Sequence, residues 1–202
     1  MFALVESGSI TKMLSGNRGI TIGDLQYPKE IFTLWTKSER EAIGIYEVEM
    51  DTSKRKDEEW YINTDVTYTF GSGKVTGSYG DAAAKNHEDT KWTSQDKTDG
   101  KIPAGKDVGD VKTEGLKTKL IRIVKAQAAG ILQDTDWYIV RKADAGTAIP
   151  SSITTHRNSV RNKQAEMETK ILDASNVAAL EALYTRNSDG VRPLGELPRL
   201  EV

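Results

Sequence analysis

Apolar and polar residues alternate in steps of two over the first eighty residues, a pattern that predicts β-strands. Met1–Val5 is a short apolar strand. A Glu-Ser-Gly-Ser turn separates it from Ile10–Leu14, so we expect these two segments to pair as a hairpin. Ile45–Met50 alternates apolar side chains with Glu47 and Glu49, which predicts a strand with one buried face.

The longest alternation runs from Trp60 to Phe70, where large or β-branched side chains recur at every second position. A Gly-Ser-Gly turn follows, and Lys74–Tyr79 then resumes the alternation. A strand, a glycine-rich turn and a second strand predict a β-hairpin.

Helix signals are sparse before residue 111 and dense after it. Ser38 and Glu41 have the spacing of a capping box, which predicts a short helix that ends at Gly44. Beyond Val111 apolar residues recur every three or four positions, which predicts an amphipathic helix of about five turns. The residues on its apolar face are Leu116, Leu120, Ile123, Val124, Ala128 and Ile131.

Three further helices are predicted in this half. Asp134-Thr-Asp136 supplies caps for a short helix that carries Trp137 and breaks at Ala145-Gly146. Pro150 starts the longest helix, from Ile153 to about Leu172, and Ser175-Asn176 caps a last one.

The change from a two-residue spacing of apolar residues to a spacing of three or four residues predicts an α+β fold. We expect an antiparallel β-rich N-terminal part, a polar connector and a small C-terminal helical part with an extended tail. The expected domains are 1–80, β-rich; 81–111, connector or arm; 112–184, helical; and 185–202, extended tail.

The connector and the tail are expected to be interaction arms that become ordered only in an assembly. They contain few apolar residues and cannot offset the cost of ordering their backbone by their own packing. Their candidate partner-binding residues are Trp92 in the connector and, at three-residue steps in the tail, Leu194, Leu197 and Leu200.

The composition excludes several classes of function but does not identify one. The 202 residues contain 28 Lys and Arg against 30 Asp and Glu, a net charge of −2 that gives no electrostatic case for nucleic acid. No apolar run reaches the length of a membrane helix, and the N-terminus lacks the pattern of a signal peptide, so no membrane contact is expected. The absence of cysteine excludes disulfides and thiolate chemistry.

The charge is distributed unevenly along the chain. Residues 1–111 carry a net charge of −5, residues 112–172 a net charge of +5 and residues 173–202 a net charge of −2. Complementary faces that meet within the chain or between copies would have this distribution. Solvated faces that simply differ in charge fit it equally well.

The sequence contains only incomplete versions of phosphate-binding and metal-binding motifs. Gly71-Ser-Gly-Lys74 resembles part of a phosphate-binding loop, but Tyr68 replaces its first glycine and Val75 replaces the final Ser or Thr. His87-Glu88-Asp89 lacks the spacing of metal ligands, and Asp134 with Asp136 is better explained by helix capping. We therefore expect no catalytic, cofactor-binding or metal-binding residues and no enzymatic activity.

The four tryptophans are the remaining conspicuous residues. Trp60 and Trp137 lie on apolar faces and are expected in the core, and the core is slightly favoured for Trp35. Trp92 stands alone in a polar segment and is the best candidate for burial against a partner.

Residues 132–161 resemble a segment found in tail-associated proteins of tailed bacteriophages, including tail-fibre assembly proteins. The pattern is a leucine, Thr-Asp-Trp, an arginine, a turn with Gly or Pro, and an aromatic residue or His before Arg-x-x-apolar-Arg. It is carried here by Leu132, Thr135, Asp136, Trp137, Arg141, Pro150, His156, Arg157, Val160 and Arg161. His156 stands where Tyr is more usual. The likeness extends moderately over residues 112–184 and faintly over residues 1–80.

The segment also has a purely physical interpretation. Trp137 would close the angle between two helices, and Arg141, Arg157 and Arg161 would pair with Asp134, Asp136 or Asp144. We therefore favour a role in the fold over a binding site for these residues.

The resemblance implies a non-enzymatic structural component of a bacteriophage virion. It would be a tail fibre, an adaptor or a baseplate-peripheral protein, made in the bacterial cytoplasm and located in the virion tail. Its expected partners are other tail or virion proteins, and it is expected to be a homo-oligomer or to be present in several copies. The alternative from a different class is a tail-fibre assembly chaperone.

Overall fold

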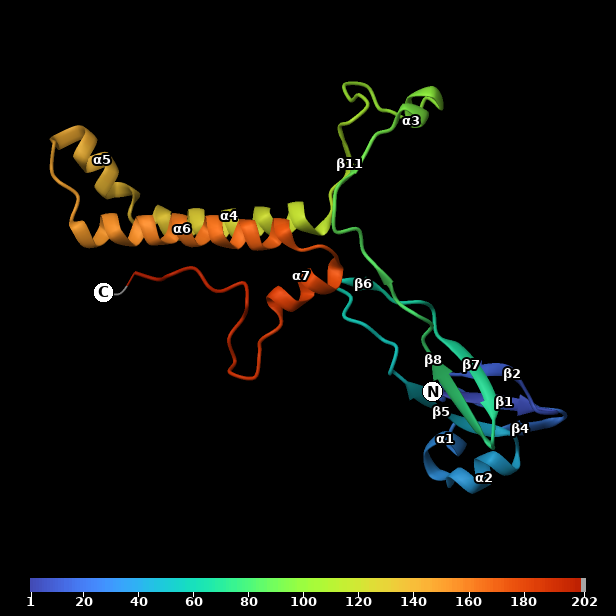
Figure 1. Ribbon diagram of the computed structural model, residues 1–202. Coiled ribbons are helices and arrows are strands. Elements are labelled where there is room, and N and C mark those ends of the chain that lie inside the picture. Colours follow the sequence, from blue (N-terminus) through green and yellow to red (C-terminus); the bar gives the residue numbers. More distant parts are fainter. Residues whose placement is uncertain (201–202) are drawn as a thin grey trace. The chain divides into compact units, whose positions relative to one another are not determined.

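The protein has an α+β fold, with strands concentrated in the first part of the chain and helices in the second (Figure 1). The computed structural model describes residues 1–200, and the chain divides into two compact units, Met1–Ala83 and Ala84–Val202. The connector and the tail therefore belong to the same compact unit as the helices.

A five-stranded sheet in the order β2-β1-β5-β8-β7 forms the framework of the N-terminal unit. Its neighbours are antiparallel except for β5 and β8, which are parallel. Some residues of the outer strands β2 and β7 also lie close to each other. The strands are β1 (Phe2–Glu6), β2 (Ser9–Leu14), β5 (Ile45–Asp51), β7 (Thr67–Gly71) and β8 (Lys74–Ser78).

The two hairpins of this sheet are those that the sequence predicts. β1 and β2 turn through Ser7-Gly8, and β7 and β8 turn through Ser72-Gly73. All four turn residues have positive φ, which is the requirement of the tight turn that matches the twist of paired strands. The phosphate-loop-like Gly71-Ser-Gly-Lys74 is therefore a hairpin turn.

The core of the N-terminal unit lies on one face of the sheet. Leu4 and Ile45 are paired across β1 and β5 and point to this face, where Ile20, Ile31 and Phe32 cover them. These covering residues come from β3 (Ile20–Ile22), which pairs with β4 (Leu25–Tyr27), and from α1 (Ile31–Leu34). Trp35 packs against the same cluster, as expected.

Two local predictions in this unit are wrong. The expected strand from Trp60 to Phe70 is interrupted, because only β6 (Tyr61–Ile62) and β7 are strands and Trp60 is a buried turn residue. The capping box also lies two residues earlier than predicted: Thr36 and Glu39 cap α2 (Lys37–Ala42). Thr36 satisfies the same Ser/Thr-x-x-Glu rule as Ser38, so sequence spacing alone does not separate the two boxes.

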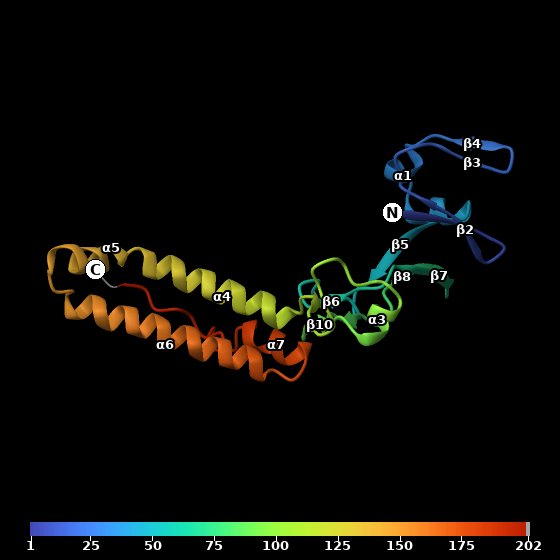
Figure 2. The same ribbon diagram turned by 90° about the horizontal axis from the view of Figure 1, so that it is seen from above.

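A helical hairpin is the framework of the C-terminal unit (Figures 1 and 2). Helices α4 (Leu116–Gln133) and α6 (Ser151–Asp173) lie side by side and antiparallel. The buried residues of α4 recur every four positions, and α7 (Val177–Tyr184) adds Val177 and Leu180 to the core. The other buried apolar residues are Leu116, Leu120, Val124 and Ala128 of α4, and Ile153, Val160, Met167 and Ile171 of α6.

The predicted helices are confirmed, with one change at the start of α4. Val111–Thr113 is a strand, β11, and the helix begins only at Leu116. The short helix is α5 (Asp136–Ala145), which ends at Gly146 with a left-handed backbone conformation. Asn176 caps α7 by accepting a hydrogen bond from the Ala179 amide at 2.9 Å.

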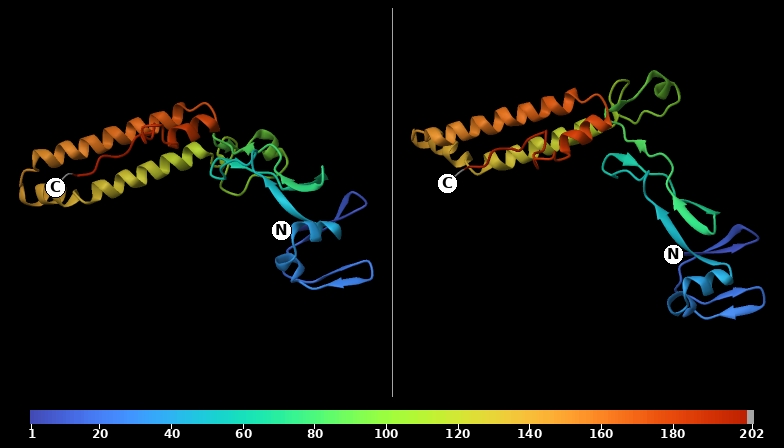
Figure 3. Two further views of the ribbon diagram at one scale, coloured as in Figure 1. Left: turned by 90° about the horizontal axis from the view of Figure 1, so that it is seen from below. Right: turned by 60° about the horizontal axis from the view of Figure 1, so that its bottom comes forward.

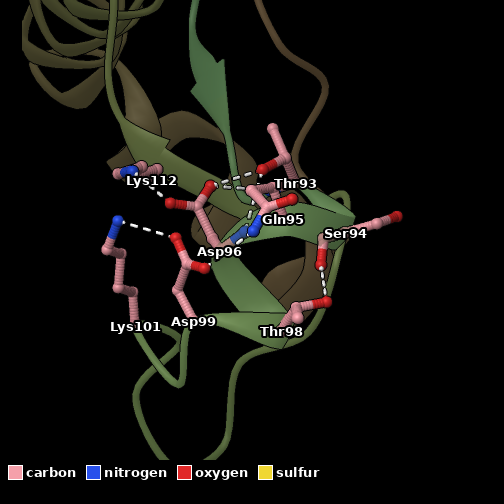
Figure 4. A network of polar contacts seen from close by, with 8 residues as sticks. All are labelled: Thr93, Ser94, Gln95, Asp96, Thr98, Asp99, Lys101 and Lys112. Atoms are coloured by element: carbon pink, nitrogen blue, oxygen red, sulfur yellow. Dashed lines mark hydrogen bonds and ion pairs between the residues drawn. The ribbon is translucent and has the colours of Figure 1, made fainter.

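The connector has more structure than an arm. After β9 (Ala83–Ala84), strand β10 (Thr90–Lys91) pairs with β11, and α3 (Ser94–Thr98) lies between them. Polar contacts hold this part, which we call the 90–113 lobe (Figure 4). Asp96 accepts hydrogen bonds from Thr93 and forms an ion pair with Lys112 at 2.8 Å. The spacing of apolar residues could not predict the 90–113 lobe, because helix caps and ion pairs hold this lobe together.

Candidate functional site

The far end of the helical hairpin is organised by one buried arginine. Arg157 of α6 is 7% exposed, and its Nη1 donates to the Leu132 carbonyl at 2.8 Å and to Thr135 Oγ1 at 2.7 Å. The same nitrogen lies 2.8 Å from Asp136 Oδ1. Leu132 lies in the last turn of α4 and Asp136 is the first residue of α5, so this cation joins a terminal carbonyl of one helix to a first-turn carboxylate of the next. The predicted side-chain caps from Asp134 and Asp136 are not formed, because the N-cap residue of α5 is Thr135 and no side chain caps the helix.

The predicted pairing of the segment's arginines with Asp136 is thus confirmed for Arg157. Thr135 is 1% exposed, and its hydroxyl also donates to the Leu132 carbonyl at 3.0 Å. Val160 is fully buried one turn further along α6. Thr135, Arg157 and Val160 therefore have the role in the fold that the sequence favours for this segment.

Trp137 is not in the core, and that prediction is wrong. No residue of α5 is buried, and Trp137, Ile139 and Val140 are 51%, 42% and 66% exposed. The Trp137 and Tyr138 rings stack with their centroids 3.8 Å apart. These rings therefore contact each other at the surface of α5 rather than packing into the core of the hairpin.

Arg141 completes this surface instead of pairing with an aspartate. Its guanidinium lies 4.7 Å from the Trp137 ring centre and 5.2 Å from the Tyr138 ring centre. Its Nε has no hydrogen-bond partner among residues 1–200. We call Trp137–Arg141 the hairpin tip; it belongs to α5, at the far end of the helical hairpin (Figure 1). Its surface is apolar and aromatic, with the Arg141 cation at the edge.

The remaining residues of the segment are divided between surface and interior. Pro150 precedes α6 as its N-cap residue, and Arg161 is exposed. His156 is 9% exposed, and its Nε2 has no hydrogen-bond partner in the described part of the chain.

Trp92 lies half-buried within the 90–113 lobe. Its backbone N–H donates to the Asp110 carbonyl at 2.9 Å, and its carbonyl accepts from the Gly109 N–H at the same distance. The Lys112 ammonium lies 4.6 Å from the centre of its ring. Part of the ring is already covered by its own lobe, and its contact with a partner stays a prediction.

The tail leucines do not share one environment. Leu194 is 1% exposed, and its N–H donates to the Leu183 carbonyl of α7 at 2.9 Å. The prediction that Leu194 is free for a partner is therefore wrong, because the helices of the same chain cover it. Leu197 is half-buried and Leu200 is 38% exposed.

A cavity of about 760 Å³ lies between the tail and the helical hairpin. Ile131 and His156 line it from the helices, and Leu197 and Leu200 line it from the tail. Arg192 and Arg199 bring positive charge to it, and Asp134 and Glu196 bring negative charge.

The contacts that start α4 could not be predicted from the pattern of residues. The Asn86 and His87 carbonyls accept from the Leu116 and Lys117 N–H groups, each at 3.0 Å, and Asp89 Oδ1 accepts from the Gly115 N–H at 2.7 Å. Hydrogen bonds from Gly115 and then from Thr118 hold the pKa of Asp89 below its ordinary value. His87-Glu88-Asp89 therefore caps a helix.

Residues 1–200 contain no group of three or more His, Asp or Glu residues placed to hold a metal ion. None of the helices in this range combines the length and the apolar character needed to cross a membrane.

Comparison of the chain with protein-family models, with curated proteins and with solved structures finds no match.

Proposed function

We propose that this protein is a non-enzymatic structural component of a bacteriophage tail, and that it binds another tail protein through the hairpin tip. The observation that carries the proposal is the exposure of Trp137, Ile139 and Val140 on a helix that buries none of its residues. The Thr-Asp-Trp segment that resembles phage tail proteins builds this helix.

The composition of the tip supports a protein partner. Tryptophan and arginine are enriched among the residues that dominate binding energy in protein interfaces. Trp137 and Tyr138 supply a rigid aromatic surface, and the Arg141 guanidinium lies beside both rings. The partner surface would be an apolar pocket with an acidic group at its edge.

The tip is an anchor within a larger interface rather than the whole of it. A stable protein interface buries about 800 Å² on each partner, which is more than a few side chains of a ten-residue helix supply. Further contacts would come from other parts of the chain, for which Trp92 in the 90–113 lobe is the candidate.

A tail-fibre assembly chaperone is the second candidate, because the same segment resembles tail-fibre assembly proteins. The two functions differ in whether the protein remains in the particle. Quantitative mass spectrometry of purified phage particles separates them: a fixed copy number supports the structural component, and absence from the particles with presence in the infected cell supports the chaperone.

A variant pair tests the tip itself. Trp137→Ala should leave the melting temperature unchanged and reduce incorporation into particles by about tenfold or more, as expected for a central interface residue. Ile123→Ala is the matched control, since Ile123 is equally exposed but lies on α4, outside the tip. Equal incorporation of both variants would contradict a role for the tip.

A further inference from the structure

The tail of the chain lies along the helical hairpin of its own unit (Figures 2 and 3). Near the C-terminal end of α6, Lys170 Nζ donates to the Pro193 carbonyl at 2.9 Å. Further along, the end of the Lys163 side chain of α6 lies beside Gly195. The tail thus runs antiparallel to α6, from its end toward its start.

Only a small part of this tail is firmly seated. Leu194 is the one residue between 185 and 200 that is fully buried. Beyond it, Leu197 and Leu200 border the cavity of about 760 Å³ rather than filling it. His156 lines the same cavity and has a buried Nε2 without a hydrogen-bond partner. The contact between tail and helices therefore depends mainly on one leucine and a few hydrogen bonds.

The turn that leads into the tail is stabilised by contacts within itself. The Asn187 N–H donates to the Val191 carbonyl, and the Gly190 N–H donates to the Asn187 carbonyl, both at 2.9 Å. Arg186 Nη1 also donates to the Gly190 carbonyl at 2.6 Å. These bonds join residues at most four positions apart and involve none of residues 193–200. The turn is linked to the following segment by the Arg186–Glu196 ion pair and by the hydrogen bond from Arg192 to the Gly195 carbonyl, each at 3.0 Å.

We infer that residues 193–200 are an exchangeable strap, and that the seat on α4, α6 and α7 also accepts this segment from a second copy of the chain. Because the incoming segment is identical, it reproduces every contact that the strap makes in its own chain. Exchange of an identical element is a low-cost route to association, favoured when copies are held at high local concentration. The inference concerns contacts between copies and does not depend on the proposed function in a phage tail.

Isotope-coded photo-crosslinking of the full-length chain tests this inference. A photoreactive amino acid replaces Leu197, and equal amounts of ¹⁵N-labelled and unlabelled protein are mixed over a range of concentrations. Cross-links from position 197 to α4 or α6 are identified by mass spectrometry. If the strap exchanges between copies, the proportion of heavy-light cross-links should rise with protein concentration. At saturation, heavy-light cross-links should be as frequent as heavy-heavy and light-light cross-links taken together.

Two variants make the result specific. Adding Leu194→Asp should lower the heavy-light cross-links by about tenfold or more, since it removes the leucine whose burial seats the strap. The photoreactive group placed at Val191, which is 57% exposed and belongs to the turn, should give no cross-links to α4. Same-isotope cross-links alone at every concentration would overturn the inference, as would heavy-light cross-links that fall outside the helices of the hairpin.

Discussion

Arg157 is a buried charged side chain whose partners gather at one end of its guanidinium. Nη1 contacts the Leu132 carbonyl, the Thr135 hydroxyl and the Asp136 carboxylate, all within 2.8 Å, whereas the buried Nε has no hydrogen-bond partner among residues 1–200. A buried cation that loses such partners is strongly unfavourable. The end of the hairpin therefore depends on this residue more than on any exposed ion pair nearby.

Replacement of Arg157 by alanine should lower the free energy of unfolding of the C-terminal unit by about 2–3 kcal/mol, the cost of removing hydrogen bonds to a buried charge. Urea titration followed by circular dichroism measures the change. Arg161→Ala is the control: this arginine lies one turn along the same helix but is exposed, so its effect should stay within about 0.5 kcal/mol. Similar losses for both variants would be evidence against the assigned role of Arg157.

Asp96 makes the 90–113 lobe sensitive to acid. Hydrogen bonds from Lys112 first, and then from Thr93, lower the pKa of Asp96 well below its ordinary value of 3.8. A carboxyl group whose pKa falls on folding stabilises the folded form fully above its ordinary pKa. That stability is lost progressively as the pH drops below the ordinary pKa toward the folded value.

Protection of the α3 amides from hydrogen exchange should therefore be constant above about pH 5 and decrease below about pH 4, where the unfolded lobe binds the proton more readily. In Asp96→Asn this decrease should be smaller, because the substituted side chain does not titrate. An acid response of α3 that is the same in both proteins would show that Asp96 does not cause it.

At the scale of the element, the start of α4 depends on a close approach of two chain segments. Gly115 is the N-cap residue, and it has no side chain to supply a cap. The carbonyls and the carboxylate of residues 86–89 take over this role. A Cβ atom at Gly115 would overlap the His87 and Glu88 backbone, so glycine is needed here for space rather than for a left-handed conformation.

Gly115→Ala should lower the stability of the C-terminal unit by about 1–3 kcal/mol, the usual cost of forcing an extra carbon into a packed site. Gly130→Ala, near the end of the same helix, has open space around the new Cβ. It should raise the stability by up to about 1 kcal/mol, because alanine is the better helix former. Thermal melts of the two variants should shift in opposite directions, and a shift in the same direction would refute this account of Gly115.

At the scale of the whole molecule, the two compact units have separate cores. Leu4, Ile20, Ile31, Phe32 and Ile45 form a cluster in the N-terminal unit. The buried leucines and valines of α4 and α6 belong to the C-terminal unit. Damage to one core should therefore appear mainly in its own unit.

Ile45→Ala and Leu120→Ala remove buried side chains from the N-terminal and the C-terminal core, respectively. Each should reduce the stability of its own unit by about 2–5 kcal/mol through the loss of buried surface and the cavity left behind. Hydrogen-exchange mass spectrometry reads both units in one experiment. Loss of protection throughout the chain in either variant would mean that the units unfold as one.

The elements that depend on short-range rules could be predicted from the amino-acid sequence. The two hairpins follow from turn residues that tolerate positive φ at fixed positions between alternating strands. Helices α4 to α7 follow from apolar residues at three- and four-residue steps and from local stop and start signals such as Gly146 and Asn176. The α+β class follows from the change of period between the two halves.

Which of these residues meet depends on the tertiary structure. Local sequence rules treat Leu194 and Trp137 alike, as apolar residues, but the helices of the chain bury Leu194 and leave Trp137 exposed on α5. The caps supplied by residues 86–89 and the contacts of Arg157 join positions roughly 20 or more residues apart in the chain. Burial and capping across such separations depend on the path of the chain in space, and the pattern of nearby residues does not contain that path.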